Sequence, residues 1–406
     1  MIIKDVYIRY HNDTITLSAN CKLRKIGWDN VYFSVNACHK TYVYEDASPF
    51  AAALLLPAMK QGEDLIIHGS ISNQLYEGMQ KIMAIVDSWH IGLRPITIKA
   101  DQLTEDHQPK RGTATFFSGG VDSFYTYLKH KQDPNPDYRV TSLLFVNNNF
   151  DVNPNNTRLW EITKQRITDI AEEEGIEPVF ITSNIHSLNL LNPILSWDYI
   201  HGSCLAATGL FLRNGFSRIY IPSTRSAEQQ IPWGSSLELD GHWSTEKVTF
   251  IYDGSEVTRV EKVRTQLAAS PLALKHLRVC YMNKKGAYNC GQCDKCLRTM
   301  INLYIAGVLD QAQTFPHEIN LELLAQTATA KHHEHQVFNI ENLEALRAIS
   351  LNPDMQKVLA SSIARSHQVR QNRVTKVRER IAYLDHQYSK GLIYKAYSGV
   401  HDRILP

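Results

Sequence analysis

The sequence predicts an α/β protein built on a doubly wound parallel sheet. Between Thr113 and Ser223, short apolar runs alternate with amphipathic stretches of helical period. Strand–helix units of this length require a parallel sheet with helices on its faces. Before and after this region the alternation is lost. We therefore expect an N-terminal α+β domain at 1–105, the α/β domain at 112–300 and a mostly helical region at 301–406.

Composition limits the class of protein. The chain has 406 residues, 43% of them hydrophobic, and 43 Lys and Arg against 41 Asp and Glu. This is an ordinary globular composition, which excludes fibrous and disordered classes, and a net charge of +2 is too small to indicate a nucleic-acid binder. No apolar run is long enough to cross a membrane, and the N-terminus lacks the apolar stretch of a signal peptide. We expect a cytoplasmic protein without a membrane partner.

The first hundred residues alternate between short strands and helices. Period-2 patterns predict strands at 6–10, 14–19, 31–35 and 65–71, and helical patterns cover 46–62 and 74–90. Asp46 or Ser48 is expected to cap the first helix, with Pro49 at its first position. The polar stretch 101–111 is a plausible linker. No phosphate or metal pattern occurs here, so this part predicts no function.

The α/β region and the region after it follow in order. Apolar runs predict strands at 113–117, 140–146, 178–182 and 217–223. Helices are expected between them at 121–130, at 158–175 with Gly175 as its end, and at 204–215 with Gly215 as its end. Four further helices are expected at 301–309, 319–328, 340–349 and 355–366.

A glycine-rich turn lies between the first strand and the first helix of the α/β region. It reads Ser118-Gly119-Gly120-Val121-Asp122-Ser123. Paired glycines let backbone N–H groups approach an anion, and the helix start adds its dipole. The two serine hydroxyls suit phosphate oxygens, and Asp122 suits Mg²⁺ held by those oxygens. The Lys of a Walker P-loop is absent, which favours a grip on a pyrophosphate leaving group.

The SGGVDS sequence after a buried strand resembles the signature of the PP-loop ATP pyrophosphatases. The resemblance implies binding of ATP and Mg²⁺ by residues 118–123. It also implies cleavage of ATP between its α and β phosphates, with adenylation of a substrate.

Four cysteines have metal-ligand spacing, C-x9-C-x2-C-x2-C, at Cys280, Cys290, Cys293 and Cys296. Four thiolates can close tetrahedrally around Zn²⁺ as a structural zinc knuckle with no open position. An iron–sulfur cluster and a redox or sulfur-relay CxxC are the alternatives. The run lacks the near fourth Cys and Pro of common iron–sulfur motifs.

The turn and the cysteines together resemble the 7-cyano-7-deazaguanine synthases. The match includes Gly291 and Arg298 in CGQCDKCLRTM and covers about 112–300. That family adenylates a carboxylate on a deazapurine, and ammonia captures the acyl adenylate. We carry over the ATP chemistry and the zinc, but not the substrate, because residues outside 112–300 have no counterpart in the family.

Three further residues complete the expected site. Asn147, with Asn148 and Asn149, follows the second strand, where the family contacts adenosine; a polar turn is the alternative. Arg225 lies in a long loop after the fourth strand, with Glu228 and Trp233, and its planar fork suits a phosphate or a substrate carboxylate. Lys262 lies where the family places a Lys that meets ATP phosphates. Arg225 and Lys262 are equally compatible with solvated side chains, and Asp253-Gly254 reads as a hairpin turn.

Other polar clusters are open to two interpretations. Cys204 with His201 could form an assisted nucleophile, although a buried thiol fits the Ala-rich helix better. His332, His333 and His335 fit a solvated stretch better than a metal site. The basic segment 365–380 fits a solvated helix face better than a tRNA-binding surface.

The expected activity is that of an ATP-dependent ligase or amidase forming a C–N bond. Asp122, Ser123, Arg225 and Lys262 are its expected catalytic residues, and its partners are a small-molecule carboxylate and an amine donor. The N- or C-terminal additions could instead accept a nucleic acid or a protein as substrate. The alternatives are a tRNA-thiolating enzyme of the same class, which needs a reactive Cys204, and a module that only senses nucleotide.

Overall fold

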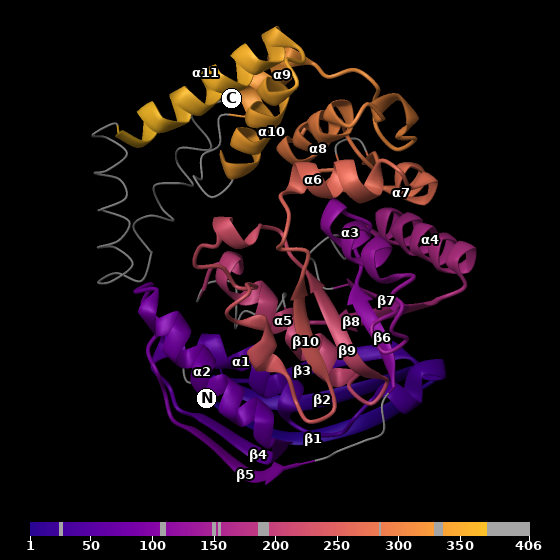
Figure 1. The fold of residues 1–406 in the computed structure, drawn as a ribbon. Coiled ribbons are helices and arrows are strands. Elements are labelled where there is room, and N and C mark those ends of the chain that lie inside the picture. The colour runs from indigo at the N-terminus through magenta and orange to yellow at the C-terminus, as the bar shows by residue number, and fades with distance from the viewer. Residues whose placement is uncertain are drawn as a thin grey trace. The chain divides into compact units, whose positions relative to one another are not determined.

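The computed structural model describes residues 1–23, 27–105, 111–147, 152, 156–185, 195–283, 286–328 and 336–371. The chain divides into two compact units. The first comprises Met1–Gly291 with Thr299–His317, and the second comprises Gln292–Arg298 with the chain from Glu318 on. The first unit carries the sheet (Figure 1).

One ten-stranded sheet runs through the described part of the first unit, in the order β10-β9-β6-β7-β8-β3-β2-β1-β4-β5. The N-terminal strands are β1 Ile2–His11, β2 Thr14–Leu23, β3 Gly27–Asn36, β4 Leu65–Ser72 and β5 Ile98–Thr104. The later strands are β6 Gly112–Phe116, β7 Val140–Asn147, β8 Glu177–Ser183, β9 Phe216–Pro222 and β10 Thr249–Asp253. The protein is thus α/β with a large, mostly parallel sheet.

The five later strands are all parallel. Their spatial order β10-β9-β6-β7-β8 reverses direction between β6 and β9. In open α/β sheets, ligands bind beyond the carboxyl ends of the strands at such a switch point. The loops that follow β6 and β9 therefore define where a site is expected.

Strand β10 was not predicted, and the hairpin turn expected at Asp253-Gly254 is wrong. β10 pairs in parallel with β9, from Thr249 opposite Arg218 to Asp253 opposite Pro222. The chain then continues into a short helix, α6 (Arg259–Lys262), instead of returning along β10. The Asp-Gly pair marks a strand-to-helix turn here, with Gly254 at φ 89°.

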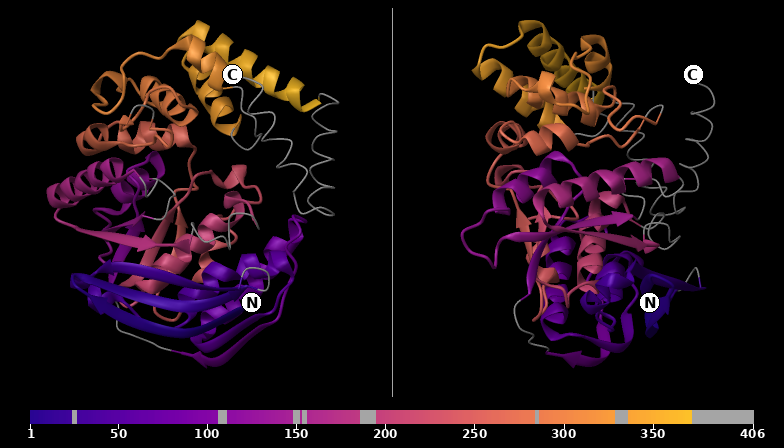
Figure 2. Two further views of the ribbon diagram at one scale, coloured as in Figure 1. Left: turned by 180° about the vertical axis from the view of Figure 1, so that it is seen from behind. Right: turned by 90° about the vertical axis from the view of Figure 1, so that its right-hand side faces the viewer.

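The N-terminal strands extend the same sheet. β3 pairs antiparallel with β8, Phe33 opposite Ser183 and Ser34 opposite Thr182. Figures 1 and 2 show the indigo N-terminal strands continuing the sheet of the later strands. A single hydrophobic core contains side chains of both parts, among them Ile3, Leu17, Phe33, Leu144 and Leu210. Residues 1–105 and the α/β region thus share one sheet and one core.

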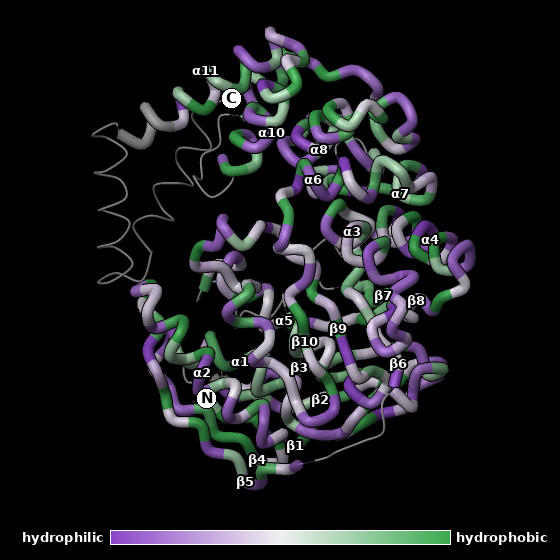
Figure 3. Tube along the Cα trace, in the orientation of Figure 1, coloured by the Kyte–Doolittle hydropathy of each residue, from purple (hydrophilic) through white to green (hydrophobic). Residues whose placement is uncertain are grey.

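Helices cover both faces of the parallel strands. On one face lie α3 (Val121–His130) and α4 (Thr157–Glu174), with Phe117 edge-on to Phe124 and Phe145 stacked on Trp160. On the other face α5 (Trp197–Phe211) packs with α1 (Ser48–Gln61) and α2 (Asn73–Ser88) into the shared core. Hydrophobic residues recur along the strands of the sheet and the helices packed on them (Figure 3).

Three local predictions need correction. The N-cap of α1 is Ala47, and Asp46 instead accepts hydrogen bonds from Ser48 and pairs with the buried Arg213. Helix α5 ends at Phe211, four residues before Gly215. The first part of the expected linker 101–111 belongs to strand β5, and 106–110 lie outside the described residues.

The remaining helices follow the strands. They are α7 Pro271–His276, α8 Asp294–Ile305, α9 Leu321–Thr327, α10 Gln336–Ala348 and α11 Pro353–Gln371. Within the second unit, α11 packs on α9 and α10, and Ser362 Oγ donates to Ala325 O at 3.4 Å. Across the described ranges no helix is both long and apolar enough to cross a membrane.

Candidate functional site

The glycine-rich turn follows β6 and opens α3. Gly119 has φ 76°, in the left-handed region that favours glycine, and Gly120 is the N-cap of α3. No side chain among the described residues caps this helix, and Ser123 Oγ donates to Gly120 O at 3.0 Å. The first N–H groups of a helix have no partner within it. The start of α3 is therefore arranged to receive an anion.

Asp122 lies in the first turn of α3 between two cations. Its Oδ1 is 3.2 Å from Lys262 Nζ, and its Oδ2 is 3.2 Å from an Arg259 guanidinium nitrogen. Both cations come from α6, which a capping box between Thr258 and Glu261 starts. Because the two positions are three apart, both side chains lie on one face of this helix. The structure thus brings Asp122 and Lys262, two of the residues singled out in the sequence, into contact.

Lys262 is almost completely buried, at 1% exposure. Its ammonium also donates to the carbonyl and hydroxyl oxygens of Ser223, the latter at 3.0 Å, just after β9. Burial lowers the pKa of Lys262, and the charge of Asp122 partly offsets this. A positive charge is thus fixed between the turn after β6 and the loop after β9, at the switch point of the sheet.

Two more buried arginines lie in the segments around the turn. Arg278 donates its backbone N–H to Gly119 O at 2.7 Å, and its side chain is 3% exposed. Arg225 follows Ser223 by two residues, is 5% exposed and lies 5.5 Å from the ring centre of Trp233. With Arg259 and Lys262, four buried cations belong to this region, and guanidinium and ammonium groups are the side chains that bind phosphates.

Asn147 ends β7, on the same edge of the sheet. Its Oδ1 is buried and has no hydrogen-bond partner among the described residues. A buried acceptor without a partner is costly, so a ligand that donates a hydrogen bond fits this position. Asn148 and Asn149 lie outside the described residues.

The sequence did not single out Ser223, Arg259 or Arg278 for this site. Arg259 was detectable, because Arg and Lys three positions apart after a Thr-x-x-Glu capping box must share a helix face. Ser223 and Arg278 carried no such signal. Ser223 contributes its carbonyl and hydroxyl oxygens, and Arg278 contributes its backbone N–H. Backbone groups are present in almost every residue type, and a hydroxyl is present in several.

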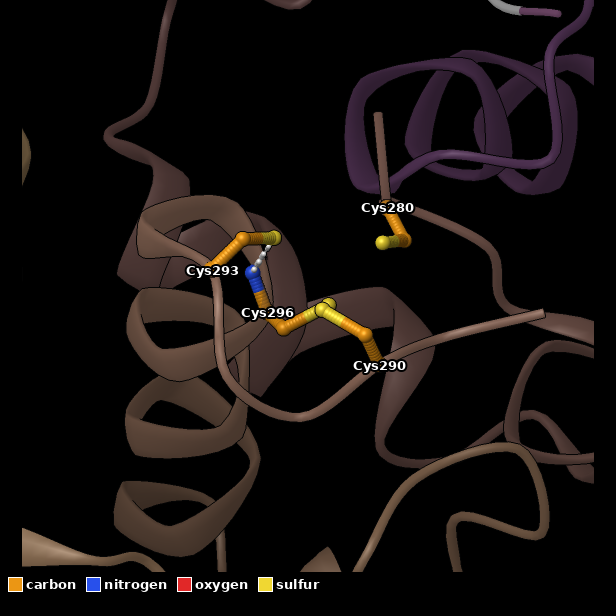
Figure 4. A group of neighbouring side chains, drawn as sticks. All are labelled: Cys280, Cys290, Cys293 and Cys296. Carbon is orange, nitrogen blue, oxygen red and sulfur yellow. Dashed lines mark hydrogen bonds between the residues drawn. The ribbon is translucent and has the colours of Figure 1, made fainter. Parts of the chain in front are cut away.

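The four cysteines gather at a second site (Figure 4). Their sulfur atoms all lie within 4.8 Å of one another, and all but the half-buried Cys290 are buried. Backbone N–H groups of Asn283 and Cys296 donate to the sulfurs of Cys280 and Cys293, at 3.1 and 3.4 Å. A compact set of four thiols matches the donor set of structural Zn²⁺, so these residues could hold a zinc ion.

Two neighbours fix the cysteine loop. Asn289 Oδ1 accepts the N–H groups of Val279 and Cys280, at 2.9 and 3.2 Å. Gly291 has φ 66°, and a Cβ there would lie 2.5 Å from Pro316 Cγ. Both the left-handed backbone and the lack of room for a Cβ therefore require glycine at this position of the CGxC pattern.

Cys204 is a core residue. It is fully buried in the hydrophobic core, and burial raises the pKa of its thiol to about 12. Burial also lowers the pKa of His201 to about 4, and its Nδ1 lies 3.2 Å from Trp197 O. The thiolate is the reactive form of cysteine, so this environment suppresses nucleophilic chemistry.

We expect Cys204→Ala to leave turnover within about twofold of wild type, because the C–N bond formation expected from the sequence does not use this thiol. Its cost in stability should be about 1 kcal/mol for a small cavity. Steady-state pyrophosphate release and urea unfolding measure the two effects. Loss of turnover in a variant that is still folded would instead favour a sulfur-transfer enzyme.

Two other predictions fall largely outside the described residues. His332, His333 and His335 are not described, and α11 ends at Gln371, within the basic segment 365–380. Arg365, in the described part of that segment, donates to Ala325 O at 3.0 Å.

The described geometry provides an uncapped helix start, a half-buried carboxylate between two cations and a buried acceptor without a partner, all at the carboxyl edge of the sheet. Such an arrangement can bind a nucleotide polyphosphate and stabilise charge that develops on it. No family model, curated protein or solved structure matches this chain.

Proposed function

We propose that this protein is an ATP-dependent adenylating enzyme of the PP-loop class. It would activate a carboxylate as an acyl adenylate, release pyrophosphate and pass the acyl group to ammonia or another amine. The observation that supports this most is the position of Lys262 and Arg259. Both contact Asp122 of the SGGVDS turn at the topological switch point.

The residues of the turn act on the leaving group. The N–H groups at the start of α3 point to where an anion binds, and Lys262 and Arg259 supply positive charge beside it. Negative charge grows on the β phosphate as the α–β bond breaks, so donors held in place there lower the barrier. No lysine in the turn follows a departing γ-phosphoryl group, which is why AMP and pyrophosphate are the expected products.

The remaining polar groups suit the rest of the reaction. Asn147 Oδ1 can accept a hydrogen bond from the adenine amino group, and Arg225 suits the substrate carboxylate. A carboxylate resists amines until its oxygen becomes a good leaving group, and AMP is such a group. The amine then displaces AMP, and an amide forms.

Mg²⁺ would accompany the phosphates of ATP, and Asp122 is the carboxylate of the turn that could contact it. Its two oxygens are each 3.2 Å from a cation, Arg259 or Lys262. Mg²⁺ bound at Asp122 would therefore share this carboxylate with Lys262 and Arg259. The cysteines, in contrast, would hold Zn²⁺ in a closed shell with a structural role.

Thiolation of a tRNA base, the alternative within this class, loses support. It needs a reactive cysteine outside the zinc set, and burial keeps the thiol of Cys204 protonated. We therefore propose carbon–nitrogen bond formation instead of sulfur transfer.

The nucleotide products test the proposal. We expect AMP and pyrophosphate in equal amounts, dependent on a carboxylate substrate, when labelled ATP is incubated with the protein and separated by chromatography. Carboxylates and amines are supplied as panels, because the sequence names neither. Asp122→Ala should reduce pyrophosphate release by about a hundredfold, the loss expected when one electrostatic element of a transition state is removed.

Two results would contradict this assignment. One is substrate-dependent formation of ADP and phosphate by the wild type. The other is an Asp122→Ala variant as active as wild type. Asp122→Ala also leaves the buried Lys262 and Arg259 without this carboxylate, which should lower the free energy of unfolding by on the order of 3 kcal/mol. Circular dichroism therefore has to show that the variant is folded before its rate is compared with that of wild type.

A further inference from the structure

Asp253, at the end of β10, is a buried carboxylate that binds three side chains of one helix. It is 7% exposed. Its Oδ2 accepts from Thr126 Oγ1 at 2.8 Å, and its Oδ1 lies 3.0 Å from Lys129 Nζ and 2.9 Å from His130 Nε2. All three partners belong to α3. A single carboxylate thus fastens this helix to the end of β10.

The fastened face of α3 is continuous with the nucleotide site. Thr126 lies four positions after Asp122, and Lys129 and His130 lie seven and eight positions after it. Residues spaced in this way share one face of a helix. Burial raises the pKa of Asp253, but the hydrogen bonds and charges of His130 and Lys129 outweigh this and hold it below its ordinary value. The ionised carboxylate is therefore the form that holds α3.

The backbone of Asp253 reaches the other side of the site. Its carbonyl oxygen accepts the N–H of Ser223 at 2.7 Å, and Ser223 in turn accepts two hydrogen bonds from Lys262. Gly254 allows the chain to turn here. A Cβ on it would lie 3.1 Å from the Tyr125 ring and 3.3 Å from Ser223 Oγ. Asp253 thus contacts both the helix that carries Asp122 and the loop that orients Lys262.

We propose that Asp253 is a positioning residue for the nucleotide site. Through α3 and Ser223 it holds the anion-binding start of α3 in register with Lys262. The inference rests on the proposed function, since it names a residue that supports pyrophosphate binding at that same site. Asp253 does not contact the pyrophosphate itself in this proposal; it acts through its partners on α3 and through Ser223.

Binding of inorganic pyrophosphate tests this role without any knowledge of the carboxylate substrate. Calorimetric titration of the full chain should show Asp253→Asn binding pyrophosphate about tenfold more weakly or worse, because small misplacements of binding groups are costly. Asp133→Asn is the matched control. Asp133 contacts the same His130 through Nδ1 at 3.3 Å, whereas the hydrogen bonds to Thr126 and Ser223 in the described chain belong to Asp253. Asp133→Asn should therefore bind pyrophosphate as tightly as wild type.

A double-mutant cycle separates positioning from a general loss of stability. If Asp253 acts by keeping α3 and Lys262 in register, Asp253→Asn should cost little affinity in a Lys262→Met background. Fully additive losses would overturn the inference. Thr126→Val removes only one hydrogen bond to Asp253 and should also weaken pyrophosphate binding. This variant tests the inference if Asp253→Asn does not fold.

The two proposals fail in different ways. Wild-type protein that does not bind pyrophosphate would contradict the proposed function. Wild-type binding that Asp253→Asn and Thr126→Val leave unchanged would contradict only the positioning role.

Discussion

Replacing Lys262 by methionine is expected to reduce pyrophosphate release by at least about a hundredfold. The side chain is almost fully buried, and its ammonium is held by Asp122 and by two oxygens of Ser223. A preorganised charge aimed at a developing anion is worth about 10²–10³ in rate. Methionine keeps the length and apolar stem of lysine and removes only the charge. Single-turnover release of labelled pyrophosphate measures the loss.

Lys275→Met is the matched control for this experiment. Lys275 pairs with Glu173 at the surface, and neither belongs to the site, so the variant should release pyrophosphate at the wild-type rate. Comparable activity of Lys262→Met and Lys275→Met would contradict the role of Lys262. Circular dichroism of both variants shows that any loss arises in a folded protein.

Cys293→Ser is expected to remove the metal and to lower the free energy of unfolding by on the order of 3–5 kcal/mol. Cys293 is buried, and its sulfur lies with three others within 4.8 Å. In a structural zinc site, the free energy of metal binding is part of the free energy of folding. Elemental analysis should find about one zinc per chain in wild type and far less in the variant, and urea unfolding measures the stability.

Cys38→Ser serves as the control, because Cys38 is exposed and lies outside the cysteine cluster. It should keep both zinc and stability. A brown wild-type protein with iron and labile sulfide would contradict the zinc assignment. So would a Cys293→Ser variant as stable as wild type. Because Zn²⁺ is expected to be structural, any decrease in the activity of Cys293→Ser should be explained by the smaller fraction of folded protein.

Much of the α/β region could be predicted from the sequence. The helix expected at 121–130 is α3 as observed, and Gly175 ends α4 in the left-handed conformation. The turn at 118–123 and the four cysteines were also recognised in advance, since each is a run of residues close in sequence. Local patterns of this kind are set by backbone preferences and periodicity, which act over a few residues.

Strand β10 and the role of Asp253 were not predicted, for a common reason. An Asp-Gly pair is compatible with a hairpin or with a strand-to-helix turn, and the choice depends on which strand pairs with the segment before it. Here β9 lies beside it in parallel. The side-chain partners of Asp253 are more than a hundred residues away along the chain, and no local pattern predicts them.

The sequence by itself determined most of the strands and helices, where the glycine-rich turn lies and which four thiols can gather, because these depend on short-range order. Only the tertiary structure decided that β3 joins β8, that Lys262 and Arg259 meet Asp122, and that Cys204 lies in the core. Strand pairing and charge contacts between distant segments depend on the free energy of burying the whole chain at once. Each such pairing or contact is fixed by packing between segments that lie far apart in the sequence.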